Sequence, residues 1–407
     1  MQINTKDNPI FYSFALLKCL TRNEGLFFMT NEVYITKLAK FLPNEPVSND
    51  EMEDYLGIIN GQPSKARRII LRNNGIKTRY YALDKTGKST HNTAEITAIA
   101  VDKLFDDKFR REQLELLACG TTTPDQILPS HAVMVHGLLK VPNVELASFS
   151  GSCCTGIQAC KFGYLSVLSG NTQNAICSGS ERFSRWMLSQ HFESEIQKIA
   201  QVEANPIIAF EKEFLRWMLS DGAGAVVLEN KPNSDKLSLK IEWIEICSYA
   251  NQLETCMYAG AEKDENGKIL GWAEFNGEDW LHKSVFSMKQ DTRLLGSNIV
   301  PLGGRFLKEI IKKRNFNIHS IDYFLPHLSS EYFRDKIFNE LQELGFAIPK
   351  GKWFTNLTKV GNIGAAAFIV MLEELVNSGN LKKGQKILIM VPESARFTYA
   401  FALLTVC

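Results

Sequence analysis

Short apolar runs alternate along the chain with segments in which apolar residues recur at helical spacing. The run at 114–119 predicts a buried strand, and the runs at 144–149 and 175–178 predict two further short strands. Helical spacing is found at 93–105 and again at 157–168, where a glycine ends the pattern. Strands that alternate with helices in this way are typical of an α/β fold.

The same alternation returns in the second half of the chain. The pattern predicts further strands at 223–228, 321–325, 386–391 and 397–405. It predicts further helices at 332–341 and 365–376. The α/β pattern therefore covers both halves of the sequence.

A polar, turn-forming segment at 231–235 is the best linker candidate between these halves. We therefore expect three parts: an N-terminal extension at 1–30, a first half at 31–230 and a second half at 231–407.

Two polar insertions interrupt the pattern, at roughly 190–215 and 262–280. The first is charged and favours a helix, and the second is rich in turn residues. A calcium loop is one interpretation of the second insertion, but the ligand spacing of an EF-hand is missing. We therefore expect a surface hairpin there.

Composition and charge exclude several classes of protein. The 407 residues are 45% hydrophobic and 22% charged, as in an ordinary soluble globular protein. The 46 Lys and Arg against 45 Asp and Glu leave a net charge of +1, so no global field attracts nucleic acid or an anionic membrane. The longest apolar run, 365–372, is far shorter than the ~20 residues that cross a bilayer. We expect a soluble protein without nucleic-acid or membrane partners.

The nine cysteines form no Cys-x-x-Cys pair and no Cys/His cluster with zinc spacing. We therefore expect no metal site, and reduced thiols in a cytoplasmic protein. The apolar stretch at 10–17 lacks the basic segment and the cleavage site of a signal peptide, which also favours the cytoplasm.

Cys153 and Cys154 lie at a junction between a predicted strand and a predicted helix. Unpaired N–H groups at a helix N-terminus favour a thiolate, so this position suits a nucleophile, although most free cysteines are buried structural residues. Cys154 is the preferred nucleophile because Thr155-Gly156 follows it, and a glycine there lets a substrate pass close to the backbone.

His327 and Asn362 are the polar residues best suited to accompany this thiol. His327 follows a predicted strand and Pro326, and Asn362 lies in a Gly-Asn-x-Gly loop before a helix. Taken alone, each of these residues has an ordinary structural role. Together with the cysteine they form a thiol nucleophile with two polarising groups, which is the pattern of acyl transfer.

These motifs resemble the thiolase superfamily, most closely the β-ketoacyl-ACP synthase III branch of condensing enzymes. The segment 152–156 is similar to the family's Ala-Ala-Cys-x-Gly loop, and 220–225 is similar to its Gly-Asp-Gly-Ala-Gly-Ala turn. Pro326-His327 and Gly361-Asn362 match the histidine and asparagine motifs, and 75–79 resembles Gly-Ile-Arg-x-Arg. The motifs follow family order from about residue 32 to the end, apart from the two insertions.

The resemblance implies a duplicated, five-layered α-β-α-β-α fold that forms a homodimer. Cys154 would accept an acyl group from acyl-CoA or an acyl carrier protein, and no cofactor is implied. His327 and Asn362 would hold the carbonyl oxygen of a malonyl thioester while it loses carbon dioxide. The backbone N–H groups of Cys154 and Ala395 would form the oxyanion hole, and Leu128 would reach across the dimer to the floor of the acyl pocket.

The chain departs from the family in two places near the expected site. The segment 392–398 replaces a Gly-rich loop, and Leu328-Ser329-Ser330 replaces Gln-Ala-Asn after the histidine, which leaves Ser330 as a malonyl-side donor. With the two insertions, these departures predict a specialised lipid or polyketide pathway, for example one that makes alkylresorcinol-like products. The alternatives are a non-decarboxylating acyltransferase, a catalytically silent partner subunit, and Cys153 as the nucleophile.

Overall fold

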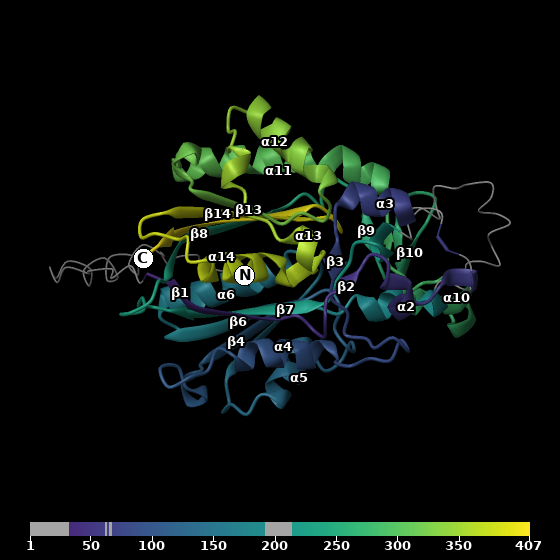
Figure 1. Ribbon diagram of the computed structural model, residues 1–407, viewed down its shortest axis with the longest axis horizontal. Coiled ribbons are helices and arrows are strands. Elements are labelled where there is room, and N and C mark those ends of the chain that lie inside the picture. The colour runs from purple at the N-terminus through teal and green to yellow at the C-terminus, as the bar shows by residue number, and fades with distance from the viewer. Residues whose placement is uncertain (1–31, 62, 65–66, 192–213) are drawn as a thin grey trace, which may run out of the picture. The chain divides into compact units, whose positions relative to one another are not determined.

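The computed structural model describes residues 32–61, 63–64, 67–191 and 214–407 (Figure 1). The expected extension at 1–30 and most of the insertion at 190–215 lie outside these residues. The long strands are β1 (Tyr34–Phe41), β4 (Leu116–Thr121), β5 (Glu145–Ser150), β6 (Asn174–Glu181), β7 (Gly222–Glu229), β8 (Leu239–Ser248), β13 (Tyr323–Pro326), β14 (Lys386–Glu393) and β15 (Thr398–Val406). The short strands are β2 (Val47–Ser48), β3 (Thr78–Arg79), β9 (Met257–Tyr258), β10 (Ala261–Lys263), β11 (Ile269–Gly271) and β12 (Lys289–Gln290).

The helices connect and cover these strands. They are α2 (Met52–Leu56), α3 (Arg67–Asn74), α4 (Thr93–Asp102), α5 (His131–Leu138), α6 (Thr155–Ser169), α10 (Gly277–His282), α11 (Thr292–Arg314), α12 (Tyr332–Glu343), α13 (Leu357–Val360) and α14 (Ala367–Asn377). Among the described residues, none of the helices combines the length and apolarity of a bilayer span.

The long strands follow one another in the hydrogen-bonded order β13-β14-β15-β8-β1-β7-β6-β4-β5. This order contains one group from the first half of the chain, β1 and β4–β7, and one group from the second half, β8 and β13–β15. The groups meet where β1 pairs with β8, and that contact consists of two residue pairs, Tyr34 with Lys240 and Ile35 with Leu239.

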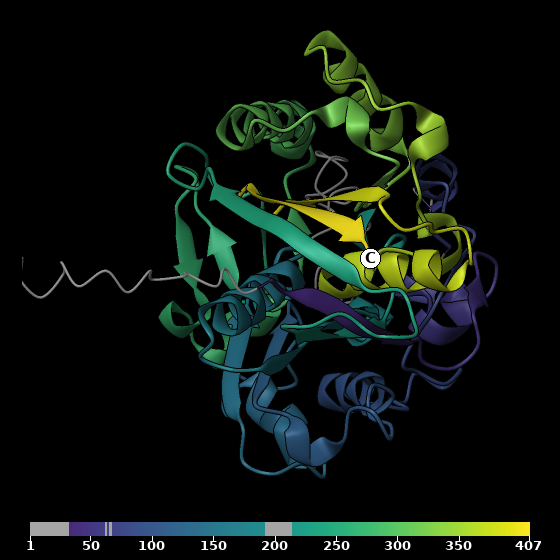
Figure 2. The same ribbon diagram turned by 90° about the vertical axis from the view of Figure 1, so that its left-hand side faces the viewer.

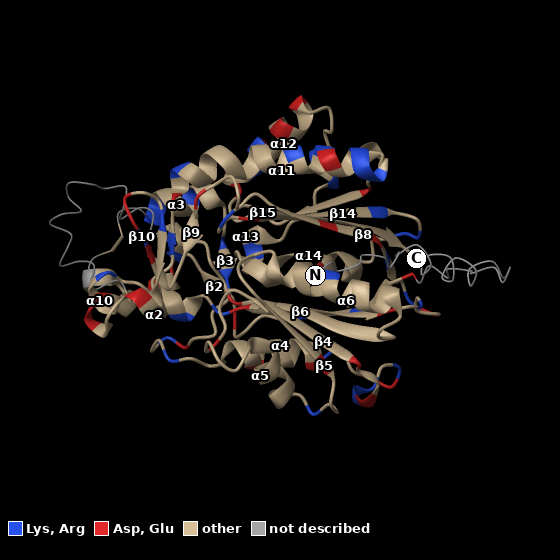
Figure 3. Ribbon diagram, turned by 180° about the vertical axis from the view of Figure 1, so that it is seen from behind, with Lys and Arg blue, Asp and Glu red and all other residues tan. Residues whose placement is uncertain are grey.

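Figures 1 and 2 show the two strand groups as separate layers with helices between and outside them. Helices α6 and α14 lie between the groups. Helices α4 and α5 cover the outer side of the first group, and α11 and α12 cover the outer side of the second. The expected five-layered α-β-α-β-α arrangement is therefore confirmed. In Figure 3, acidic and basic residues are mixed on α11 and α12, while most of the inner elements are without them.

Three glycines let the inner layers approach closely next to the expected site. A Cβ at Gly156 or at Gly179 would lie 2.2 Å from the carbonyl oxygen of Ala365, and a Cβ at Gly120 would lie 2.3 Å from the carbonyl oxygen of Thr155. Only a residue without a side chain permits such contacts. The start of α6 is therefore pressed against the loop that precedes α14.

Most of the predicted elements are present, with ends shifted by a few residues. The insertion at 262–280 contains the antiparallel β10–β11 pair followed by α10, so the expected surface hairpin is confirmed. The 23-residue helix α11 was not predicted. Its interior holds Pro301 and three glycines, which are poor helix formers, and its buried face packs against the second strand group instead.

Candidate active site

The two neighbouring cysteines at the start of α6 point to different places. Cys153 is partly exposed and lines a small cavity, together with Ser152. The thiol of Cys154 is 2% exposed and donates to the carbonyl oxygen of Val391 in β14 at 3.3 Å. The structure therefore brings Cys153, and not the thiol of Cys154, to the cavity.

Burial dominates the chemistry of both thiols. It raises the pKa of Cys153 to about 12 and raises the pKa of Cys154 well above its ordinary value. The negative charge of Glu393 is the second cause in each case. We expected the helix N-terminus to favour a thiolate, but burial outweighs that effect, so both groups rest as thiols.

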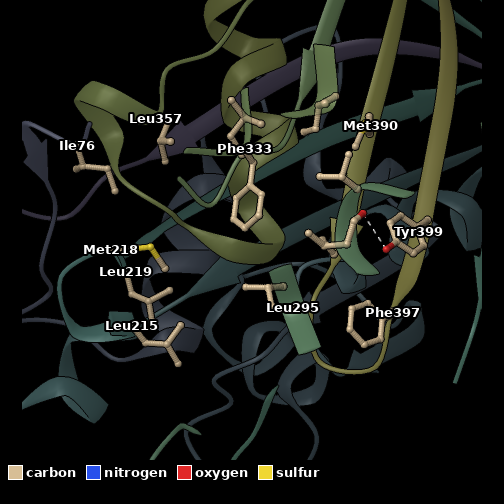
Figure 4. Close-up of a cluster of buried hydrophobic side chains, with 14 of the residues drawn as sticks. Ile76, Leu215, Met218, Leu219, Leu295, Phe333, Leu357, Met390, Phe397 and Tyr399 are labelled. Atoms are coloured by element: carbon tan, nitrogen blue, oxygen red, sulfur yellow. Dashed lines mark hydrogen bonds between the residues drawn. The ribbon is translucent and has the colours of Figure 1, made fainter. Parts of the chain in front are cut away.

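The cavity has a volume of about 40 Å³ and is bounded by segments from both halves of the chain. His327 and Asn362 line it along with Cys153. Its apolar wall belongs to the buried cluster in Figure 4, in which Leu219 and Leu295 are labelled and Tyr399 donates to the carbonyl of Ile299 at 3.0 Å. A cavity of this size holds a few water molecules and no acyl chain.

His327 is held at the end of β13 with a free ring nitrogen. Its backbone N–H donates to Met390 at 2.8 Å, which continues the pairing of β13 with β14. The side chain is 3% exposed, and within the described residues its Nε2 has no hydrogen-bond partner. Burial lowers the pKa of His327 to about 4, so the ring is neutral at pH 7 and offers Nε2 to a ligand.

Asn362 is hydrogen-bonded through its backbone to residues of the first half of the chain. It forms a parallel bridge with Leu219, its N–H donates to Met218 at 3.1 Å, and its carbonyl accepts from Ser220 at 2.9 Å. Its Oδ1 accepts the N–H of Gly364 at 3.0 Å. Because the acceptor oxygen is used within the loop, the amide N–H groups are the donors left for a ligand.

Glu181 ties the Asn362 loop to the first strand group. Its carboxylate accepts from Thr122 Oγ1 at 2.6 Å, from Thr123 Oγ1 at 3.0 Å and from the N–H of Ala365 at 3.0 Å. Burial raises its pKa to about 7. The sequence motifs did not single out this residue. The sequence signal that could have found it is an acidic residue at the end of a predicted strand. A carboxylate that is buried there needs several hydrogen-bond donors around it.

Three other residues that the sequence predicts for the site do not line the cavity. The N–H of Ala395, expected in the oxyanion hole, donates to Oε1 of Glu393 at 2.6 Å. Ser330 is buried and donates to the carbonyl of Asn73 at 3.4 Å, while its neighbour Ser329 lines the cavity. Leu128 is 83% exposed, and its role in an acyl pocket remains a prediction.

A larger groove of about 950 Å³ is lined by residues next in sequence to those of the cavity. Arg182 lines the groove and Phe183 the cavity, and Ser287 and Met288 divide in the same way. Residues of the 262–280 insertion also line the groove. Its aromatic side chains include Trp186, Trp272, Trp280 and Phe286.

In the described part of the chain, no group of three or more His, Cys, Asp or Glu side chains is placed to hold a metal ion.

Comparisons with known proteins place these features in context. Residues 311–405 match the family described as 3-oxoacyl-[acyl-carrier-protein (ACP)] synthase III C terminal. A β-ketoacyl-[acyl-carrier-protein] synthase III of Clostridium perfringens (strain ATCC 13124) is 26% identical over 370 residues, which cover 89% of this chain and 96% of that protein. The enzyme of the same name from Aquifex aeolicus is 25% identical over 350 residues, covering 86% of this chain and 91% of that protein.

Solved structures support the fold. The tetronic acid condensing enzyme AbyA1 superposes with a TM-score of 0.71 at 20% identity and covers 92% of this chain and 99% of that one. OleA of Xanthomonas campestris, solved as a cysteine-to-serine variant with bound lauric acid and lauroyl-CoA, gives a TM-score of 0.67 at 18% identity and covers 93% of this chain and 100% of that one.

Proposed function

We propose that this chain, a β-ketoacyl-ACP synthase III-like condensing enzyme of the thiolase superfamily, forms a carbon–carbon bond by decarboxylative Claisen condensation. A cysteine-bound acyl group would be the electrophile, and a malonyl or β-ketoacyl thioester would supply the nucleophilic carbon. The observation that carries the proposal is that a cysteine thiol, His327 and Asn362 line one buried cavity.

The first step is transfer of an acyl group from a thioester to a cysteine at the start of α6. Since both candidate cysteines rest as thiols, the attacking sulfur must lose its proton during the transfer. The neutral His327 ring, which lines the same cavity as Cys153, is suited to accept that proton and to pass it to the departing thiolate of the acyl donor. Spacing to Gly156 favours Cys154 as the nucleophile, and access to the cavity favours Cys153, so the experiment below treats them separately.

The second step is loss of carbon dioxide from the malonyl unit. The negative charge that develops on the thioester carbonyl oxygen would be stabilised by His327 Nε2–H and by the amide N–H of Asn362. Removing one such donor typically lowers the rate about 100- to 1,000-fold. The resulting carbanion attacks the acyl-cysteine carbonyl, the carbon–sulfur bond to the cysteine breaks, and the β-ketoacyl thioester departs while the enzyme's cysteine thiol is regenerated by protonation.

The groove supports the choice of a long acyl substrate. The catalytic cavity is too small for a hydrocarbon chain, whereas the groove has the volume of a typical ligand site and an aromatic lining. Arg185 in the groove is suited to a phosphate of CoA or of a carrier-bound pantetheine, while Arg182 beside it is paired with Asp125. We place the enzyme in fatty-acid-related or specialised lipid or polyketide synthesis in the cytoplasm, acting on acyl-CoA or acyl carrier protein substrates without a cofactor.

We further propose that the chain acts as a homodimer. Ile127 and Leu128 are adjacent and exposed at 68% and 83%, which is unfavourable for a free monomer surface. In a dimer, Leu128 would meet the acyl chain of the partner subunit.

A second candidate function is acyl transfer without decarboxylation. The observation that favours it is that Ser330, the expected malonyl-side donor, does not line the cavity and donates to the carbonyl of Asn73 instead. This weakens the malonyl side of the site compared with the expectation from the family.

The experiment is intact-protein mass spectrometry after incubation with a panel of acyl-CoAs and acyl carrier proteins. Wild type, Cys153→Ala and Cys154→Ala are compared. A mass gain of one acyl group that is lost in only one variant identifies the nucleophile.

The acylated enzyme is then mixed with carboxyl-labelled malonyl thioesters. Release of labelled carbon dioxide with a β-ketoacyl product supports condensation. Acylation with no release from any malonyl thioester supports the second candidate instead, and absence of acylation in wild type would favour a catalytically silent subunit.

A further inference from the structure

Glu393 closes the turn between β14 and β15 with its own side chain. It is the last residue of β14 and is 6% exposed. Its Oε1 accepts the N–H of Ala395 at 2.6 Å, and its Oε2 accepts the N–H of Thr398 at 3.1 Å. The neighbours Pro392 and Ser394 line the catalytic cavity, so this turn is one of the cavity's walls.

The rest of the turn is fixed from outside. The carbonyl of Ala395 accepts from the N–H groups of Cys256 at 2.8 Å and Met257 at 3.1 Å, and Arg396 Nε donates to the carbonyl of Leu253 at 3.1 Å. Phe397 is wholly buried with a φ of 59°. Because the backbone is held on both sides, the N–H of Ala395 keeps its direction whether or not the carboxylate accepts it.

The carboxylate has no cation beside it. Among the described residues Glu393 forms no ion pair, and the side chain of Arg396 is engaged with the Leu253 carbonyl. The negative charge of Glu393 raises the pKa of Cys153, Cys154 and Tyr399. Burial raises the pKa of Glu393, and the N–H groups of Ala395, Arg396 and Thr398 oppose that rise. Backbone donors, together with the hydroxyl of Thr398, therefore stabilise this buried carboxylate.

We propose that Glu393 is a positioning residue that reserves the Ala395 N–H. The carboxylate occupies this donor in the resting enzyme and releases it when the carbonyl oxygen of an acyl thioester enters the cavity. The inference rests on the proposed function, because the entering oxygen belongs to the acyl donor. It also gives a reason for an acidic residue where relatives of this type are expected to have a Gly-rich loop.

Two consequences distinguish this role from a merely structural one. A charged acceptor holds an N–H more strongly than a neutral amide does, so a neutral residue would release the donor more easily. A negative charge near a thiol also opposes its ionisation, so removing the charge would make the cysteine at the cavity ionise at lower pH.

The test compares wild type, Glu393→Gln and the control Glu245→Gln. Glu245 is another buried glutamate, but it lies in β8 and pairs with Lys313 and Arg314. The first readout uses no substrate: the rate at which methyl methanethiosulfonate modifies Cys153 is measured at pH 8 by peptide mass spectrometry. This pH lies well below the pKa of the thiol, so the rate is proportional to the small thiolate fraction. The proposal expects the thiol pKa to fall by about one unit in Glu393→Gln alone, which gives about a tenfold faster reaction at pH 8.

The second readout is the acylation reaction. The KM for the acyl donor should fall about fivefold in Glu393→Gln, with a smaller change in kcat, and should be unchanged in Glu245→Gln. An unchanged modification rate together with an unchanged KM overturns the proposal. If wild type accepts no acyl group, the proposed function fails, while the modification profile still decides whether Glu393 acts on the thiol.

Glu393→Asp covers the case in which the glutamine variant does not fold. This change keeps the charge but shortens the side chain by one methylene, so the modification rate at pH 8 should stay at the wild-type value while the KM falls. A tenfold faster modification in Glu393→Asp would overturn the proposal, because the charge is still present.

Discussion

A methyl group added at Gly179 would collide with the loop that carries Asn362. The Cβ of alanine would lie 2.2 Å from the carbonyl oxygen of Ala365 and 2.7 Å from its carbonyl carbon. These are backbone atoms, so no side-chain rotation relieves the contact. The strand cannot retreat either, because Gly179 is paired with Gly120 of β4 on one side and Gly224 of β7 on the other. The Ala365 segment must therefore move.

The size of the effect follows from two contributions. Forcing a methyl group into a packed interior typically costs about 1–3 kcal/mol. Moving Ala365 also breaks its N–H bond to the buried carboxylate of Glu181, which costs about another 1–3 kcal/mol. We expect Gly179→Ala to lower the free energy of unfolding by about 2–6 kcal/mol. Since Asn362 is in the same loop, we also expect a loss of about 100-fold in condensation rate.

Urea unfolding and carbon dioxide release measure these two effects. Gly137→Ala is the matched control, because Gly137 lies inside α5 and its Cβ would meet nothing within 4 Å. In the control we expect unchanged activity and a gain of about 0.5–1 kcal/mol, because alanine is the better helix former. A Gly179→Ala variant as stable and active as wild type would refute the steric reasoning.

Three further predictions concern other parts of the site. Folding raises the pKa of Glu181 from about 4.5 to about 7, so the protein loses about 3 kcal/mol of stability as the pH rises between these values. In Glu181→Gln, the difference in unfolding free energy between pH 5 and pH 8 should shrink by that amount. An unchanged difference would contradict the pKa shift. Leu128→Phe should shorten the preferred acyl chain, which competition between acyl donors measures; unchanged selectivity would refute the role of Leu128. Trp280→Ala should raise the KM for long acyl donors more than for short ones, and an equal effect on both would remove the groove from the acyl path.

Local patterns predicted the elements whose information is local. Strand β4 is an apolar run, and α6 has an apolar face, so each could be found without knowing what it packs against. Helix α11 was missed because its proline and glycines obscure the periodic signal, and contacts with distant strands stabilise it.

The sequence could predict only those site residues that lie at the ends of helices or strands. His327 and Asn362 meet at the cavity as expected, because both follow or precede regular elements. The direction of the Cys154 thiol depends on Val391, more than 230 positions away, and the partner of the Ala395 N–H depends on a side chain that no local pattern assigns. Long-range contacts of this kind decide which neighbouring groups reach a ligand.

Because Asn362 forms a bridge with Leu219, the site depends on both halves of the chain. If the protein were produced as two fragments divided at 231–235, each fragment would carry only part of the constellation. The first would hold the cysteines and lack His327, and the second would hold His327 and Asn362 without the backbone that orients the asparagine. Activity would therefore report reassociation of the fragments, and in this respect the chain is equivalent to an obligate heterodimer whose subunits are covalently joined.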